Sequence, residues 1–266
     1  MSLTSELHDR RVSLCGVNLH LLTRDDLLEL VGSAVASRER VLVLHHNLHS
    51  LYLYETNSSF RNVYRRASAV YIDGLPLVWV ARAAALPLTC AHRITFLDSF
   101  ESVLAEAEHR HWRVFYLGSK PAVAEKARAL FQKLYPRLHI QVHDGYFDKS
   151  GRENDLVVQQ INDFKTDILF VGMGMPLQEY WIQANYARFS LAATFTCGAT
   201  LDYVTGDAYR PPEWAGALGL YGLFRLAADP LRLWRRYLIE PFVVACAMFP
   251  RFVRQRLARE SRLLQP

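Results

Sequence analysis

The sequence predicts an α/β fold, in which a Rossmann-like, mostly parallel sheet carries helices on both faces and is followed by a helical, basic, membrane-associating appendage. Short apolar runs that suit buried strands alternate with longer helical stretches, as in repeated βα units. Most of these runs end in glycine or in polar residues, as strands do where they enter loops. The alternation stops at residues 206–212, where an arginine-rich segment begins.

The first unit of the chain differs from the units that follow it. Residues 13–21 alternate around Gly16, Val17 and Asn18, which predicts a short hairpin. Thr23 then suits the N-cap position of an amphipathic helix that runs through Arg38. We therefore expect a hairpin and a helix over about residues 12–38, ahead of the main sheet.

The main sheet is predicted from six apolar runs, each too short for a helix. They are residues 41–46, 70–73, 114–117, 140–143, 168–172 and 193–197. The clearest helices between them are residues 121–135, 154–164 and 177–186. Because helices separate most of the strands, the connections are crossovers and the sheet should be parallel.

The charge of the chain is concentrated at its end. Residues 209–266 hold ten arginines against four acidic residues, a surplus larger than the net charge of +5 of the whole chain. We expect a catalytic domain over residues 1–205 and an appendage of helices only over residues 206–266. The surplus indicates an anionic partner. Nucleic acid is disfavoured, because many aromatic and aliphatic residues separate the arginines and no nucleic-acid motif is present.

Composition and targeting signals favour a cytosolic protein. Hydrophobic residues make up 51% of the 266 residues and charged residues 21%, which is typical of a globular chain. The polar amino terminus lacks the apolar core of a signal peptide. The apolar run at residues 241–250 is half the length of roughly 20 residues that a spanning helix needs. The four cysteines show no metal or disulfide spacing.

Asp73 is the first candidate for chemistry, because it ends the apolar run 69–72. Ligands of open α/β sheets bind at the carboxyl ends of the strands, where this carboxylate would meet a substrate. Asp73 could equally cap the helix that starts near Leu75. Local sequence alone leaves both interpretations open.

Other strand ends carry glycines and histidines. Gly172-Met-Gly174 lacks the third glycine of a dinucleotide-binding loop, because Leu177 stands there. The helices after Gly118 and Gly174 could still offer backbone N–H groups to a diphosphate. The histidines at 45, 46 and 49 lack a telling third-ligand spacing, and neighbouring strand residues face opposite ways, so hydrogen-bonding or packing roles are favoured over a metal site. A serine hydrolase is disfavoured because the chain has no nucleophile elbow.

Taken together, these residues resemble the WecG/TagA/CpsF glycosyltransferase family, also called glycosyltransferase family 26. The similarity runs in order from about residue 13 to residue 237. It is carried by Asn47, the string Asp73-Gly-Leu-Pro-Leu-Val-Trp79, Arg93, Leu117-Gly118 with Pro121, Gly145-Tyr-Phe147, Val171-Gly-Met-Gly-Met-Pro-Leu-Gln178-Glu179, Gly198-Ala-Thr-Leu-Asp202, Gly206, Arg210-Pro-Pro-Glu-Trp214, Arg225-Leu and Pro230-Leu-Arg232-Leu-Trp-Arg235-Arg-Tyr237.

The resemblance implies an inverting transferase that moves a sugar from a UDP-sugar to a polyprenyl-diphosphate-linked sugar. It implies no cofactor and no metal, a place on the cytoplasmic face of the membrane, and an anionic membrane surface as partner, and it leaves a homo-oligomer open. Asp73 matches the family's general base. Donor or acceptor binding is implied for His45, Asn47, Arg93, Gly118, Gly172, Gly174, Gln178 and Asp202, and diphosphate binding for Arg225, Arg232 and Arg235.

Two departures from the family pattern bear on the donor sugar. Many members that transfer N-acetylmannosamine have threonine where His45 stands, and a Gly-x-Asp-Leu motif where residues 95–98 stand. The string around His45 is more similar to the exopolysaccharide branch, including the xanthan-type β-1,4-glucosyltransferase. UDP-glucose is therefore favoured as donor, with UDP-N-acetylmannosamine next. The alternative is a membrane-surface binding module without catalysis.

Overall fold

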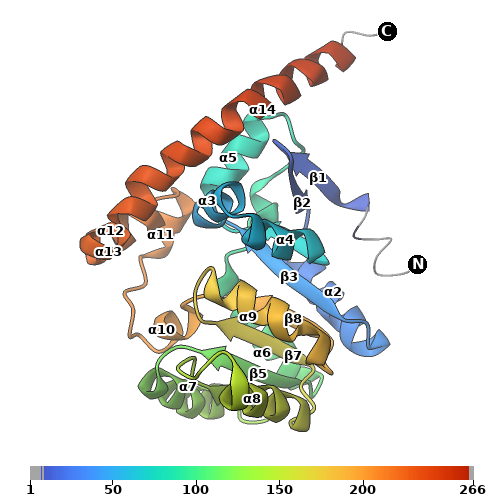
Figure 1. The fold of residues 1–266 in the computed structure, drawn as a ribbon, viewed down its shortest axis with the longest axis vertical. Coiled ribbons are helices and arrows are strands. Elements are labelled where there is room, and N and C mark those ends of the chain that lie inside the picture. Colours follow the sequence, from blue (N-terminus) through green and yellow to red (C-terminus); the bar gives the residue numbers. More distant parts are fainter. Residues whose placement is uncertain (1–6, 8, 264–266) are drawn as a thin grey trace.

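A computed structural model of the chain, which describes Leu7 and residues 9–263, contains a six-stranded, all-parallel sheet (Figure 1). The α/β class and the helices on both faces are confirmed. Across the sheet the strands are, in spatial order, β4 (Ala69–Ile72), β3 (Val41–His46), β8 (Ala193–Thr196), β7 (Ile168–Gly172), β5 (Arg113–Gly118) and β6 (His139–His143).

The hairpin forms, but its turn lies earlier than predicted. Strand β1 (Arg11–Leu14) pairs with β2 (Val17–His20), and Leu14 faces Val17 across a two-residue turn. Cys15 and Gly16 have φ values of 51° and 84°, the left-handed pair that such a turn requires. The turn is therefore Cys15-Gly16, and Val17 and Asn18 belong to the second strand.

Two hydrophobic layers sandwich the sheet, because alternate strand residues point to opposite faces. One face packs against α3 (Leu48–Thr56), α4 (Ser58–Arg66), α5 (Leu75–Ala83), α8 (Gly151–Asp163) and α9 (Leu177–Asn185). The other face packs against α2 (Arg24–Ser37), α6 (Phe96–His109) and α7 (Pro121–Leu134). The short turns η1 (Cys90–His92) and η2 (Tyr186–Arg188) complete the connections.

Helix boundaries follow local chemistry closely. Thr23 caps α2 as expected, in a reciprocal capping box with Asp26. Helix α8 starts at Gly151, three residues before the predicted start at Asn154. Glu153 accepts a hydrogen bond of 2.6 Å from the Asp148 backbone N–H, which ties the preceding loop to the first turn of the helix.

Beyond the sheet, every regular element of the described chain is helical, as predicted. After α10 (Thr200–Val204) come α11 (Glu213–Ala217), α12 (Tyr221–Ala228), α13 (Pro230–Trp234), the π-helical turn η3 (Arg235–Ile239) and the long helix α14 (Glu240–Leu263). Asp229 caps α13 and Pro230 opens it, so the segment that carries the arginines is broken into short helices. None of the described helices has the length and apolarity needed to cross a bilayer.

The long helix α14 lies along α3 and α5 and beside the hairpin (Figure 1). Val244 and Met248 are 4% exposed and belong to the same apolar layer as α3. Arg251 pairs with Glu55 at 2.7 Å, and Gln255 bonds the backbone of the hairpin. The appendage is thus packed onto the core of the molecule, and removing it would expose apolar surface. Whether residues 1–205 form a separate domain stays a prediction.

Candidate active site

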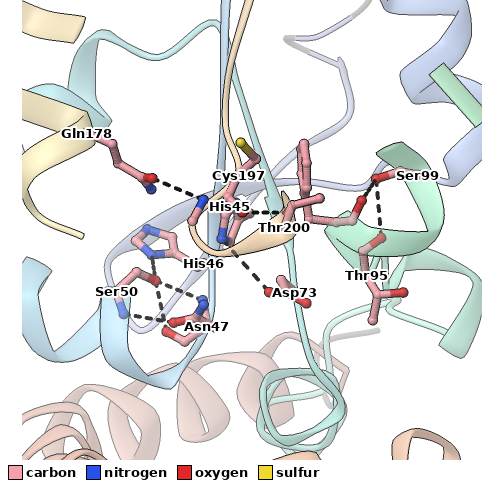
Figure 2. A network of polar contacts seen from close by, with 12 residues as sticks. His45, His46, Asn47, Ser50, Asp73, Thr95, Ser99, Gln178, Cys197 and Thr200 are labelled. Atoms are coloured by element: carbon pink, nitrogen blue, oxygen red, sulfur yellow. Dashed lines mark hydrogen bonds and ion pairs between the residues drawn. The ribbon is translucent and has the colours of Figure 1, made fainter. Parts of the chain in front are cut away.

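The parallel pairing of β3 and β4 brings His45 and Asp73 to the same edge of the sheet. His46 lies opposite Ile72, and the Asp73 N–H donates to the His46 carbonyl at 2.9 Å. Nε2 of His45 lies 3.9 Å from Oδ2 of Asp73, too long for a direct hydrogen bond. Figure 2 shows the Asp73 carboxylate directed toward the His45 ring.

The carboxylate of Asp73 does not cap the helix that follows it. The N-cap of α5 is Gly74, which has φ 105°, and this helix start receives no side-chain capping bond. The cap interpretation is therefore wrong. The side chain of Asp73 remains 26% exposed, so its oxygens are available at the mouth of the sheet edge.

His45 is buried beside this carboxylate and is neutral at pH 7. Burial lowers the pKa of His45, Asp73 offsets part of this effect, and the charge of Arg236 lowers the pKa further. The ring packs on Tyr71 and Phe96, with centroids 5.6 and 6.3 Å away. Its Nδ1 atom is buried without a hydrogen-bond partner among the described residues.

The neighbouring polar cluster organises the start of α3 (Figure 2). Oδ1 of Asn47 accepts from the Ser50 N–H at 3.0 Å and so caps the helix. His46 contacts the Ser50 hydroxyl at 3.0 Å and stacks on Tyr64, and burial lowers the pKa of His46 to about 3. His49 contacts Glu240 of α14 at 2.6 Å. The hydrogen-bonding and packing roles expected for the three histidines are confirmed.

The part of the chain that the structure describes contains no cluster of side chains that could coordinate a metal ion. Among those residues, no three histidine, cysteine, aspartate or glutamate side chains gather closely enough to hold an ion. Metal independence stays a prediction.

Gly118 and Gly172 are required by the packing of adjacent strand ends. A Cβ atom on Gly118 would lie 2.3 Å from the Gly172 carbonyl oxygen. A Cβ on Gly172 would lie 2.2 Å from the Tyr116 hydroxyl and 2.6 Å from the Gly198 carbonyl. Larger side chains would push β5, β7 and the loop after β8 apart, so these two glycines set the spacing of the loops.

The buried side chain of Gln178 connects the loop after β7 to the loop after β8. It has no exposed surface, and its Oε1 accepts from the Gly174 N–H at 3.2 Å and the Gly198 N–H at 3.1 Å. Its Nε2 donates to Glu179 at 2.9 Å. The Gly174 N–H is therefore engaged within the protein, and the expectation that the helix after it offers N–H groups to a diphosphate stays a prediction.

Asp202 lies at the far side of the candidate site. Its Oδ2 accepts from the Ser119 hydroxyl at 3.1 Å, which links α10 to the loop between β5 and α7. The next residue, Tyr203, lies beneath the guanidinium of Arg225, whose Cζ is 5.7 Å from the ring centroid. This contact brings α12 of the appendage to the sheet edge.

The other two predicted arginines are exposed on the surface of the appendage. Arg232 pairs with Asp229 at 2.6 Å and its side chain is 74% exposed, while Arg235 is exposed on the next turn. Arg236, which was not predicted, is partly buried and close enough to His45 and Arg225 for their charges to interact. The nearby carboxylate of Glu240 is engaged by His49. The one feature of the sequence that could have pointed to Arg236 is its position next to the predicted Arg235.

Arg93 extends the sheet edge beside Asp73. Its backbone forms an isolated parallel bridge to Ile72, and its Nη1 donates to the Gly216 carbonyl of α11 at 3.5 Å. The segment 95–98, which stands where other family members have the Gly-x-Asp-Leu motif, supplies Thr95 as the N-cap of α6 and then the first turn of that helix; nothing is described of the side chain of Asp98.

A separate cavity of about 250 Å³ lies at the opposite edge of the sheet. It is lined by residues of the hairpin and of the amino ends of β3 and β4, among them His20, Val41 and Ser68. None of the predicted site residues borders it. The chemistry proposed for Asp73 is therefore located outside this cavity, at the carboxyl edge of the sheet that the appendage borders.

Comparison with known proteins identifies the family. The Glycosyl transferase WecG/TagA/CpsF family matches residues 12–262. The chain is 27% identical to the N-acetylglucosaminyldiphosphoundecaprenol N-acetyl-beta-D-mannosaminyltransferase of Staphylococcus aureus strain NCTC 8325, over 96% of this chain and 99% of the relative. Proteins of the same name from strains COL and MRSA252 match equally well. These names specify N-acetylmannosaminyl transfer, so they lend no support to the xanthan-type branch. With nearly its whole length matched, the chain belongs to the WecG/TagA/CpsF family of glycosyltransferases.

Proposed function

We propose that this glycosyltransferase moves a hexosyl group from a UDP-sugar to a polyprenyl-diphosphate-linked sugar, with Asp73 as general base. The observation that carries the proposal is the Asp73 carboxylate, which is free of the helix cap and open to solvent. It lies at the edge of the sheet to which the appendage also brings arginines. The family match over nearly the whole chain supports the reaction class.

Asp73 removes the proton of the acceptor hydroxyl as that oxygen attacks the anomeric carbon of the donor. The bond from this carbon to the diphosphate breaks on the opposite side, so the configuration inverts and UDP leaves with the electron pair. General-base catalysis of this kind is worth about 10²–10⁴-fold in rate. His45 is neutral at pH 7 and does not neutralise Asp73.

Arg225 and Arg236 stabilise the negative charge that develops on the departing diphosphate. Guanidinium groups pair with phosphate oxygens through two parallel hydrogen bonds, which suits this task without a metal. Within the described residues neither arginine forms an ion pair with a carboxylate. Both lie where helices of the appendage meet the sheet edge. The more exposed Arg232 and Arg235 are assigned to phosphate groups of the membrane or the acceptor.

The outer surface of the appendage is suited to a membrane surface that holds the lipid-linked acceptor. Apolar side chains that are 45–91% exposed project from its helices among the arginines; they are Leu218, Leu223, Leu231, Trp234, Leu238, Ile239, Phe242, Phe249 and Leu257. An amphipathic surface of this composition binds at the boundary of lipid headgroups and acyl chains, and arginines add attraction to anionic lipids. We place the protein as a peripheral protein on the cytoplasmic face of the membrane.

Two donor sugars follow from different observations. The names of the S. aureus relatives favour N-acetylmannosamine, with a GlcNAc-diphosphoundecaprenol acceptor. The resemblance of the string around His45 to the exopolysaccharide branch favours glucose. His45 is buried behind Asp73, so its ring forms part of the wall of the base site. A panel of UDP-sugars decides between the two.

The experiment uses the full chain with bacterial membranes and radiolabelled UDP-N-acetylmannosamine or UDP-glucose. Label should appear in lipid-linked sugar with one donor, and Asp73→Asn should abolish it. If neither donor labels lipid and UDP does not bind, the transferase proposal fails. That result would favour the alternative, a membrane-surface binding module without catalysis. Truncation after residue 206 is a poor test, because it would also expose the apolar surface that Val244 and Met248 cover.

A further inference from the structure

The loops after β7 and β8 present bare backbone at the candidate site. Gly174 and Gly198 have φ values of 82° and 55°, and a Cβ atom on either would meet nothing within 4 Å. Their surfaces therefore face open space, while their N–H groups point inward to Gln178. The orientation of one buried amide thus determines how the two loops sit relative to each other.

The amide of Gln178 is in turn held by Glu179. Nε2 of Gln178 donates to Oε1 of Glu179 at 2.9 Å, and this bond forces Oε1 of the amide toward the two glycines. An amide rotated by half a turn would present its NH₂ group to two N–H donors. Glu179 therefore decides which way the Gln178 amide points.

Glu179 is an unusual carboxyl group for this position. It has no exposed surface, and its Oε2 has no hydrogen-bond partner among the described residues. Burial raises the pKa of Glu179 to about 8; the hydrogen bonds from Gln178 and from the Glu179 backbone N–H offset only part of this effect, and no described lysine or arginine adds to them. The titratable group that faces it is Tyr64 of α4, on which His46 of β3 stacks; Tyr64 donates to the His45 carbonyl at 2.8 Å.

We propose that Glu179 is a positioning residue for the transfer reaction: by accepting the bond from the Gln178 NH₂ group it orients that amide, which clasps the two glycine loops in the shape that receives the donor. The inference rests on the proposed function, because it assigns these loops to the donor. It adds a residue to which no role had been given.

The sign of the pH effect follows from burial. A carboxyl group with a raised pKa is neutral at pH 7 and ionises as the pH rises through about 8. The ion keeps the bond from Gln178 but adds a buried negative charge, which no described cation balances, directly behind loops that receive an anionic substrate. The competent population falls about tenfold for each pH unit above the pKa, and the apparent KM rises in proportion.

The test compares Glu179→Gln and Glu179→Leu with Glu125→Gln, a matched control on α7 whose parent carboxylate is 71% exposed. The glutamine variant can still accept from Gln178 but cannot ionise, and the leucine variant cannot accept. Donor KM and kcat are measured from pH 6.5 to 9.5. Hydrogen exchange of the Gly174 and Gly198 amides is measured on the same proteins, with circular dichroism as a check on folding.

We expect the wild type and E125Q to show a donor KM about tenfold higher at pH 9 than at pH 7, and E179Q to show no such rise. E179L should raise KM at both pH values and speed exchange of both glycine amides. An alkaline rise that persists in E179Q, or slow exchange in a folded E179L, would overturn the inference. If the wild type binds no UDP, the proposed function fails, while the exchange rates still decide whether Glu179 positions the loops.

Discussion

The two sides of the candidate site are built in different ways. On the sheet side, Asp73 and His45 are held by two adjacent, fully buried strands in fixed register. On the appendage side, Arg225 and Arg236 are held by short helices and a π-helical turn that pack onto the sheet edge. The carboxylate therefore has a position that strand pairing dictates, whereas the position of each cation depends on how several short helices dock.

This contrast explains why the sequence predicts positions less well on the appendage side. Arg225, Arg232 and Arg235 would share a face of a continuous helix. Asp229 and Pro230 start a new helix after Arg225, and the wider turn from Arg235 to Ile239 changes the rotation again. In the structure Arg236 lies close enough to His45 for its charge to lower the pKa of that ring, whereas Arg232 pairs with Asp229 and is exposed to solvent.

The largest expected effect comes from the sheet side. Asp73→Asn keeps the size of the side chain but removes the base, so transfer should fall by about 10²–10⁴-fold in kcat. The measurement is initial-rate transfer to a lipid-linked acceptor, with thermal unfolding as the control for folding. A variant that keeps more than a tenth of the activity would contradict the assignment of the base.

The next effect separates the arginines of the appendage. Arg236→Gln should lower kcat by about 10²-fold, the usual cost of losing one donor to a developing oxyanion. Arg232→Gln is its matched control, since Arg232 is 74% exposed and already pairs with Asp229. The control should keep kcat on a detergent-dispersed acceptor and bind anionic vesicles less tightly. Equal losses of kcat in the two variants would show that Arg236 has no special role.

A smaller effect should follow from weakening the link between the two sides. His49 and Glu240 lie 2.6 Å apart between α3 and α14, with side chains 17% and 12% exposed. Glu240→Gln should lower the free energy of unfolding by about 1 kcal/mol, the typical worth of one such contact. Chemical denaturation measures this change. No loss of stability, together with unchanged activity, would mean that other contacts hold α14 in place.

Most of the sheet was predictable, because most of its strands are apolar runs that end in polar or turn-forming residues. The strand of residues 41–46 and that of residues 168–172 were predicted to the residue. Asp73 could be placed at the sheet edge for the same reason. The role of Gln178 was not predictable, because its partners Gly174 and Gly198 meet only when β7 and β8 pair. The docking of Val244 and Met248 likewise depends on tertiary packing that no local pattern encodes.

The separate roles of the sheet side and the appendage side are tested most directly by calorimetric titration of UDP into wild type, Asp73→Asn and Arg236→Gln. If the carboxylate acts on the acceptor and the arginine on the diphosphate, D73N should bind UDP as tightly as wild type. R236Q should bind it about tenfold or more weakly, since a hydrogen bond between charged groups is worth about 1.5–3 kcal/mol. Weak binding by D73N together with wild-type binding by R236Q would contradict the account.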